Sequence, residues 1–362
     1  MARAITLNDT QDTLMVGTFG HEVIKVPVNL AQKSAQQATV LVHGHYAPVK
    51  NLPNEAWGLA SFPKSDKYAT VSDDATLRVW DTKTRKQISM LSLEVDLKGN
   101  AIPQEKNIIS HSAMARSIDV SPDERYIAVG MRDGSIRVYK SQPAEPFWVY
   151  AHHCVCADAR KSKFKLAEWI EDLKFSPDGK YLMVGSHNNG LYLFTAPNFD
   201  QFTKVDSASS SFITHLDWSL DSKAIRTNDG SYELLYYSVP DIKQLKSGAT
   251  QFRDEPWATQ SCVLGWNVQG IWQAGMDGTD INHADRSHQP ICETGQVVAT
   301  ADDRGKVSLF KYPSPVDKPA KAVVGHGHSS HVTKCRFNAT DSYLFSAGGN
   351  DTTIMQWRIK KA

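Results

Sequence analysis

The sequence predicts an all-β protein, a single seven-bladed β-propeller over residues 1–362, and three observations support this fold class. One phrase recurs along the chain: a strand, a turn, a second strand, a tight turn, and a third strand that ends on an aromatic residue. The tight turns of the clearest copies carry Asp-Gly or Asn-Gly, which suit hairpins because both central positions need positive φ. The strands are short and rich in β-branched and aromatic residues.

The two clearest copies begin at residues 117 and 172, and each first strand leads into Ser-Pro-Asp. Their tight turns contain Asp133-Gly134 and Asn189-Gly190. Five further units follow the same phrase: residues 4–26, 57–80, 213–237, a split unit opened by 261–266 and resumed by 297–300 and 307–310, and 332–357. Fourth strands are expected at 39–42, 147–150 and 322–324, and the long connections lie near 31–39, 95–112, 152–167 and 267–296.

Several residues match the repeat signature of WD proteins. Gly-His follows two of the expected fourth strands, and Trp80-Asp81 is a full Trp-Asp pair. In such repeats a His, a strand Ser or Thr, a turn Asp and a Trp form one buried hydrogen-bonded string, because buried polar groups need partners. We interpret the following residues as structural: His45, Asp74, Trp80, Asp133, Asp229, His328, Ser346, Asp351 and Trp357.

The composition is that of an ordinary soluble chain. Apolar residues make up 41%, charged residues 22%, and the formal net charge is +1, so nucleic acid is not an expected partner. No apolar run approaches the roughly 20 residues of a membrane span, and the N-terminus lacks the apolar region of a signal peptide. The five cysteines have no disulfide-framework spacing, so we expect reduced thiols in a cytosolic protein.

The sequence contains no convincing set of catalytic groups. His152, His153, Cys154 and Cys156 offer zinc ligands, but the second ligand pair of a structural zinc site is missing, so a plain connection between blades is favoured. The oxygens of residues 277–282 lack the spacing of a calcium loop, and Asx turns are expected there instead. No phosphate-binding glycine motif is present. We therefore expect a protein without enzymatic activity, metal or cofactor.

Two stretches go beyond the generic repeat. Residues 277–282 read Asp-Gly-Thr-Asp-Ile-Asn, and residues 348–358 read Gly-Gly-Asn-Asp-Thr-Thr-Ile-Met-Gln-Trp-Arg. With residues 56–60, 212–219 and 257–265, they resemble the carboxy-terminal propeller of the echinoderm microtubule-associated-protein-like (EML) family, along residues 2–358. The resemblance implies that the chain is the second half of a longer protein with two propellers, or a short relative reduced to that half.

The resemblance also implies a microtubule-associated protein of the cytoskeleton, cilium or flagellum, with tubulin and the upstream propeller of the same protein as partners. The residues offer one candidate contact for the acidic surface of tubulin, the basic run with Arg160, Lys161, Lys163 and Lys165. An adaptor of a ubiquitin ligase is the alternative. Lys83 stands where such adaptors often carry Arg in a Trp-Asp-x-Arg motif, and Lys lacks the bidentate fork. A propeller enzyme is the third hypothesis, and it is disfavoured because the sequence contains no convincing set of catalytic groups.

The last unit has no room for a fourth strand. Only five residues follow Trp357, so we expect three strands there and an open edge along residues 354–359. Open edges invite pairing with another strand. We expect sequence upstream in the longer protein to cover this edge.

Overall fold

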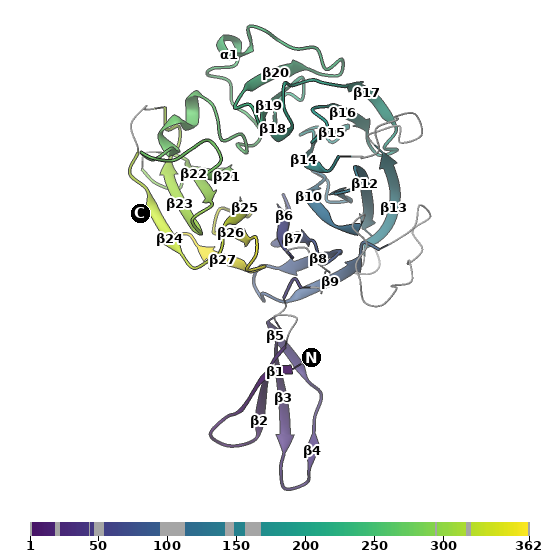
Figure 1. The fold of residues 1–362 in the computed structure, drawn as a ribbon, viewed down its shortest axis with the longest axis vertical. Helices are drawn as coiled ribbons and strands as arrows, with labels where there is room; N and C mark the ends of the chain where they lie inside the picture. The colour runs from purple at the N-terminus through teal and green to yellow at the C-terminus, as the bar shows by residue number, and fades with distance from the viewer. Residues whose placement is uncertain are drawn as a thin grey trace.

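The computed structural model describes residues 2–18, 22–42, 44–46, 54–94, 113–141, 148–155, 168–293, 295–315 and 320–360. Regular structure in these residues is almost entirely β-strand, in seven antiparallel sheets. Six sheets surround one axis as a propeller ring, and the N-terminal sheet projects outward from it (Figure 1). No helix in these ranges has the length and apolar character needed to cross a bilayer.

The strands of the first three sheets along the chain have the following bounds. The N-terminal sheet contains β1 (Ala2–Leu7), β2 (Thr13–Thr18), β3 (Val23–Asn29), β4 (Ser34–Ala35) and β5 (Thr39–Val42). The first ring sheet contains β6 (Ala56–Ser61), β7 (Lys67–Ser72), β8 (Thr76–Asp81) and β9 (Gln87–Ser92). The second contains β10 (Ala115–Val120), β11 (Tyr126–Met131), β12 (Ser135–Ser141) and β13 (Trp148–Val155).

The remaining four ring sheets follow in chain order. The third contains β14 (Ile170–Phe175), β15 (Tyr181–Ser186), β16 (Leu191–Thr195) and β17 (Gln201–Val205), and the fourth β18 (Ile213–Trp218), β19 (Ala224–Asp229) and β20 (Leu234–Ser238). The fifth contains β21 (Ile281–Arg286), β22 (Val297–Asp302), β23 (Lys306–Lys311) and β24 (Val323–His326), and the last β25 (Val332–Phe337), β26 (Tyr343–Gly348) and β27 (Ile354–Arg358). Helix α1 (Gly248–Gln251) and the 3-10 helix η2 (Trp266–Ile271) lie between the fourth and fifth sheets.

Each innermost strand of the ring carries a β-bulge near its start. The register shifts around the second residue of every one of these strands, and the six extra residues are Trp57, Arg116, Glu171, Thr214, Asn282 and Thr333. Bulges re-aim side chains. The bulge therefore gives each sheet one side chain at the end of the central channel where the innermost strands begin.

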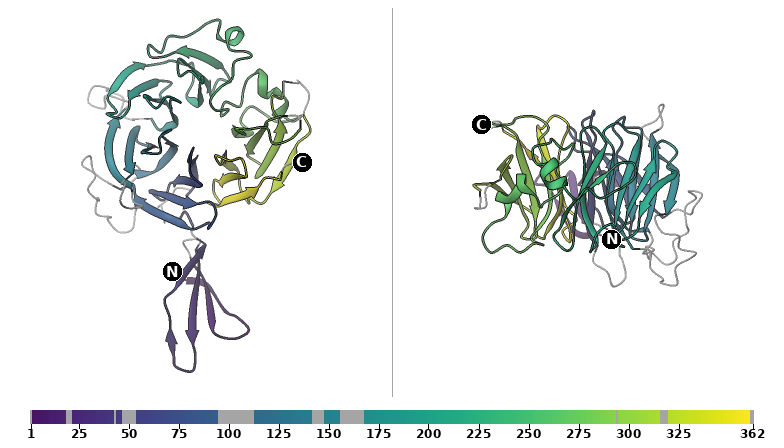
Figure 2. Two further views of the ribbon diagram at one scale, coloured as in Figure 1. Left: turned by 180° about the vertical axis from the view of Figure 1, so that it is seen from behind. Right: turned by 90° about the horizontal axis from the view of Figure 1, so that it is seen from above.

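The ring closes through direct packing of its last sheet on its first. The rings of Tyr68 and Phe345 stack with centres 4.2 Å apart, within a core cluster that also contains Leu59, Trp80 and Ala347. The Thr333 hydroxyl donates to the Ala56 carbonyl at 2.7 Å. Figure 2 shows the ring edge-on, with the sheets standing side by side around the axis.

The N-terminal sheet corrects one expectation. Residues 4–26 form three strands as predicted, with the same bulge between Ala2 and Ala4, but their sheet is not inserted between the last and first ring sheets. Those two sheets already contact each other. Strand β1 is exposed along its whole length, whereas the innermost ring strands are mostly buried.

The predicted start of the split unit was also wrong. Residues 261–266 do not open the fifth ring sheet, because its innermost strand is β21, which includes Ile281 and Asn282 of the Asp-Gly-Thr-Asp-Ile-Asn stretch. A sequence signal for this existed. Asp119-Val-Ser, Asp217-Trp-Ser and Asp285-Arg-Ser occupy the same place at the ends of β10, β18 and β21.

The fourth strand of the second ring sheet is longer than predicted. Its fourth strand, β13, continues to Val155 and pairs along β12 as far as Ser135. His152, His153 and Cys154 therefore lie in a strand and not in the connection that was predicted for them.

Candidate functional site

Two strings of hydrogen bonds, one buried in the first ring sheet and one partly buried in the last, contain most of the signature residues. In the first ring sheet, His45 lies 3.0 Å from Asp74 and 2.7 Å from the Thr70 hydroxyl. Trp80 Nε1 donates to the same hydroxyl at 2.8 Å. Burial lowers the pKa of His45, which favours the neutral imidazole within this string.

The last ring sheet repeats this string. His328 lies 3.1 Å from Asp351 and 2.7 Å from the Ser346 hydroxyl, and Trp357 Nε1 donates to Ser346 at 2.8 Å. The other two signature aspartates shape turns instead. Asp133 accepts the Ser135 backbone N–H at 2.9 Å.

Asp229, in the fourth ring sheet, accepts three donors: the backbone N–H groups of Ser231 and Glu233 and the hydroxyl of Ser209. These bonds fix the turn after β19.

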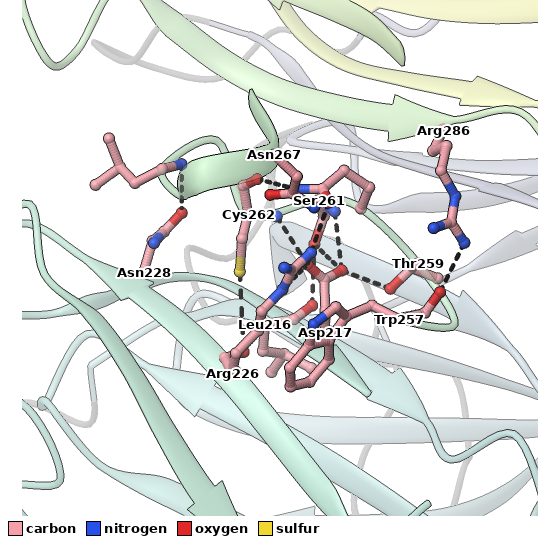
Figure 3. Close-up of polar contacts among 12 residues, drawn as sticks. Leu216, Asp217, Arg226, Asn228, Trp257, Thr259, Ser261, Cys262, Asn267 and Arg286 are labelled. Atoms are coloured by element: carbon pink, nitrogen blue, oxygen red, sulfur yellow. Dashed lines mark hydrogen bonds and ion pairs between the residues drawn. The ribbon is translucent and has the colours of Figure 1, made fainter. Parts of the chain in front are cut away.

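A buried ionic cluster fastens the long insertion between the fourth and fifth ring sheets (Figure 3). Asp217 and Arg226 form an ion pair at 3.1 Å, and Arg226 also donates to Gln260 at 2.7 Å. Asp217 accepts the backbone N–H groups of Ser261 and Cys262 at 2.8 and 3.1 Å. Residues 261–266 were predicted to form an innermost strand. Instead, the Asp217 carboxylate holds this segment through the backbone N–H groups of Ser261 and Cys262.

The rest of the insertion is shaped by local polar bonds. Asp277 accepts the Thr279 backbone N–H at 2.8 Å and its hydroxyl at 2.6 Å, which is the Asx turn expected from the sequence. Asn282 donates to the Val332 carbonyl at 3.0 Å. Asn282 is the bulge residue of β21, so this bond links the fifth ring sheet to the last.

An aromatic belt crosses the channel mouth on the face where the innermost strands begin. We define the belt by six residues that each contact the next: His331, Trp57, Arg116, Trp169, His187 and Phe212. Their successive separations are 6.2, 4.0, 4.6, 4.4 and 4.2 Å, between ring centres or from the Arg116 guanidinium carbon to a ring centre. The belt joins five consecutive ring sheets.

Four nitrogen donors in and beside the belt have no acceptor among the described residues. Arg116 is 6% exposed, and its Nε has no hydrogen-bond partner in the described part of the chain. The same holds, within those residues, for Nε1 of Trp57, Nε1 of Trp169 and Nε of Arg132. Buried donors without acceptors cost about 1–3 kcal/mol each.

Acidic side chains balance the cations beside the belt. Burial raises the pKa of Glu171, but the hydrogen bond from His187 and the charges of Lys334 and Arg116 outweigh it, so the pKa is lowered. Burial raises the pKa of Asp73 to about 6 despite the neighbouring Arg116. The mouth therefore combines Trp and Arg side chains, two residue types that are enriched in protein-interaction hot spots, with carboxylates beside the cations.

A cavity of about 240 Å³ opens inside the belt. Its lining includes the bulge residues Trp57, Glu171, Thr214, Asn282 and Thr333. Tyr232 on its rim is 55% exposed, and a Cβ on Gly278 would stand 2.1 Å from the Tyr232 ring. Glycine in the Asp-Gly-Thr-Asp-Ile-Asn stretch thus lets Tyr232 lie against the insertion.

At the opposite mouth of the central channel, buried carboxylates join neighbouring sheets. Asp285 accepts the Phe337 backbone N–H at 2.7 Å and pairs with Arg336 at 3.1 Å. Asp119 accepts the Phe175 backbone N–H at 2.8 Å. Burial raises the pKa of Asp119 to about 6. These carboxylates each connect one innermost strand to the next.

The predicted contact residues Arg160, Lys161, Lys163 and Lys165 lie outside the described residues. Cys156 of the zinc candidate also lies outside them. Within the described residues, no group of three or more His, Cys, Asp or Glu side chains is placed to hold a metal ion.

Comparison with known protein families gives a match for the residues of the ring. The family model described as "Echinoderm microtubule-associated protein second beta-propeller" matches residues 56–359. The chain belongs to the EML family. The matched residues cover all six ring sheets and begin after the N-terminal sheet.

Curated EML relatives match along nearly the whole chain. The human echinoderm microtubule-associated protein-like 2 is 36% identical over 96% of this chain and 46% of its own length. Human echinoderm microtubule-associated protein-like 3 is 35% identical over 96% of this chain and 33% of its own length. The ciliary WD repeat-containing protein ctxp80 of Euplotoides octocarinatus is 36% identical over 84% of this chain and 40% of its length. The chain thus spans less than half the length of these relatives.

Sequence reasoning missed the aromatic belt of this EML propeller. Its signal was present, since Trp57, Trp169, Phe212 and His331 each stand at or immediately before the start of an innermost strand. Only the ring arrangement shows that these positions adjoin.

Proposed function

We propose that this chain is a non-catalytic protein-binding platform of a microtubule-associated protein, acting on the cytoskeleton or in the cilium. The EML relatives are named as microtubule-associated and one further relative as ciliary. The observation that carries the binding role is the aromatic belt, with its Arg116 held between two indoles and its unpaired donors. Tubulin, which has an acidic surface, is the proposed partner.

Microtubule co-sedimentation at low salt tests this proposal. We expect Arg116→Lys to weaken binding about tenfold, because Lys keeps the charge but loses the planar stack on Trp57 and Trp169. The matched control is Arg125→Lys in the same sheet, whose side chain is 72% exposed at the other face. Equal binding by both variants, with unchanged melting temperatures, would contradict a role for the belt.

We also propose that a second, upstream propeller of the longer protein covers the N-terminal sheet. Ile5 and Leu7 of β1 are 62% and 40% exposed, although β1 has the bulge of an innermost propeller strand. Hydrogen exchange tests this: the β1 amides should exchange fast in this chain and slowly in the longer protein. Equal rates in the two proteins would contradict it.

A further inference from the structure

A cavity of about 230 Å³ opens at the mouth of the central channel that lies opposite the aromatic belt. All six ring sheets contribute to its wall, through residues at the ends of their innermost strands. Its volume is below the roughly 300–1,000 Å³ of pockets that hold drug-sized ligands. The cavity therefore has the size for one long side chain of a partner.

Equivalent positions of the six innermost strands bring charged side chains to this end of the channel. Lys174 pairs with Asp172 at 2.7 Å. Asp217 pairs with Arg226, and Asp285 with Arg336, both at 3.1 Å. Within the described residues, Asp119 is the one charged member of the set without an ion pair. The set, three residues after each bulge residue, is Ala60, Asp119, Lys174, Asp217, Asp285 and Arg336.

The other charged side chains of the cavity wall are engaged elsewhere. His288 lies 2.8 Å from the Asp341 carboxylate. Arg286 donates to the Trp257 carbonyl at 2.6 Å. Neither side chain therefore serves as the counter-charge of Asp119.

The surroundings of Asp119 favour a positive ligand. Its Oδ2 accepts the Phe175 backbone N–H at 2.8 Å. Burial raises the pKa of Asp119 to about 6, although the charges of Arg336 and Lys174 act in the opposite direction. Both of these cations are already paired, and a carboxylate removed from water is costly unless it is paired as well. The charge that complements this mouth is therefore positive.

Apolar side chains surround the path to Asp119. Pro122 follows Asp119 by three residues in the turn after β10, so Asp119 lies deeper in the channel than this proline. Apolar walls of this kind pack against the methylene stem of a long cationic side chain. The wall contains Phe62, Pro63, Pro122, Phe175, Pro177 and Phe337.

We propose that this cavity binds a lysine side chain of a protein partner, with the ammonium group on Asp119 and the stem along the apolar wall. One Asp119 oxygen already accepts the Phe175 N–H, so the two-oxygen arrangement that Arg prefers is incomplete. Lys needs only one oxygen, because its ammonium group is a compact point charge. The site lies at the other end of the channel from the belt, so it does not depend on microtubule binding there.

Amide NMR titration of the full chain with short peptides tests the proposal. The probe is acetyl-Ala-Lys-Ala-amide, and the matched peptide carries acetyl-lysine, which keeps the stem but loses the charge. We expect the first peptide to shift the Val120 and Phe175 amides and to bind about tenfold more tightly than the second. A third peptide with Arg in place of Lys should also bind more weakly than the first.

Asp119→Asn is the decisive variant, because it removes the charge and keeps an oxygen for the Phe175 N–H. We expect it to weaken lysine-peptide binding about tenfold. Asp123→Asn is the control: it makes the same charge change in the same sheet, at a side chain that is 48% exposed. It should leave the affinity within about twofold, since exposed charges are screened.

Three results would overturn the proposal. The first is an absence of shifts at Val120 and Phe175 with millimolar lysine peptide. The second is equal affinity for the lysine and acetyl-lysine peptides, or tighter binding of the Arg peptide. The third is equal binding by Asp119→Asn and Asp123→Asn, which would place the peptide elsewhere on the ring.

Discussion

The Ser346 hydroxyl lies 2.7 Å from His328 Nε2 and accepts a hydrogen bond from Trp357. Thr70 makes the same two contacts in the first ring sheet. Ser346→Ala leaves two polar partners unpaired, so we expect a loss of about 2–4 kcal/mol in the free energy of unfolding. Ser346→Thr should restore the bonds and cost less than about 1 kcal/mol. Urea denaturation measures both, and equal losses would contradict a hydrogen-bonding role.

The carboxylate of Asp217 is expected to hold the long insertion in place. Asp217→Asn leaves Arg226 buried without its counter-charge, which typically costs about 3–5 kcal/mol. We also expect faster proteolysis within residues 248–280. Asp221→Asn is the control, because Asp221 lies in an exposed turn of the same sheet and the change should stay within about 0.5 kcal/mol. Unchanged proteolysis in Asp217→Asn would show that the insertion is held by other contacts.

Asp119 should make the stability depend on pH. Burial raises its pKa from 3.8 to about 6, so the folded state binds more protons than the unfolded state between these values. The loss of folding stability caused by ionising Asp119 is therefore greatest above pH 6, and it disappears as the pH falls toward 3.8. We expect Asp119→Asn to be more stable than the wild type at pH 8, by at most about 3 kcal/mol. The difference should shrink at pH 5, as followed by thermal melting, and a difference that does not change with pH would contradict this.

The basic run gives a prediction of its own. We expect weak microtubule binding that falls as salt is raised, since charged surfaces carry the contact. Replacing Arg160, Lys161, Lys163 and Lys165 by Ala should weaken co-sedimentation at low salt. The control replaces four exposed cations elsewhere on the ring: Lys83, Arg125, Lys180 and Lys223. Binding that survives the first set, or that both sets weaken equally, would exclude the run as a specific site.

The microtubule partner itself also has a direct check. No co-sedimentation of this chain at low salt would place the tubulin contact outside this chain. Loss of binding in the belt variant alone would instead assign it to the channel mouth.

Most of the local elements could be predicted, and the candidate site could not. The strand phrase, the turns at Asp133 and Asn189 and the string through His328 depend on residues close together in one unit. The belt depends on residues such as Trp57 and Trp169, which are brought together only when neighbouring sheets pack around the axis. The place of these residues at or before the start of an innermost strand is visible in the sequence, but their contact across neighbouring sheets is not.

The sequence by itself determined most of the strands, their order within each sheet and the three-stranded last unit, because alternation and turn chemistry are local. The tertiary structure decided that the N-terminal sheet stands outside the ring, because direct packing of Phe345 on Tyr68 leaves no gap for it. It also decided that β21, and not the segment at Ser261, is an innermost strand. The backbone N–H groups of Ser261 and Cys262 donate to the carboxylate of Asp217. These residues are more than 40 positions away from Asp217, so no local sequence pattern encodes the contact.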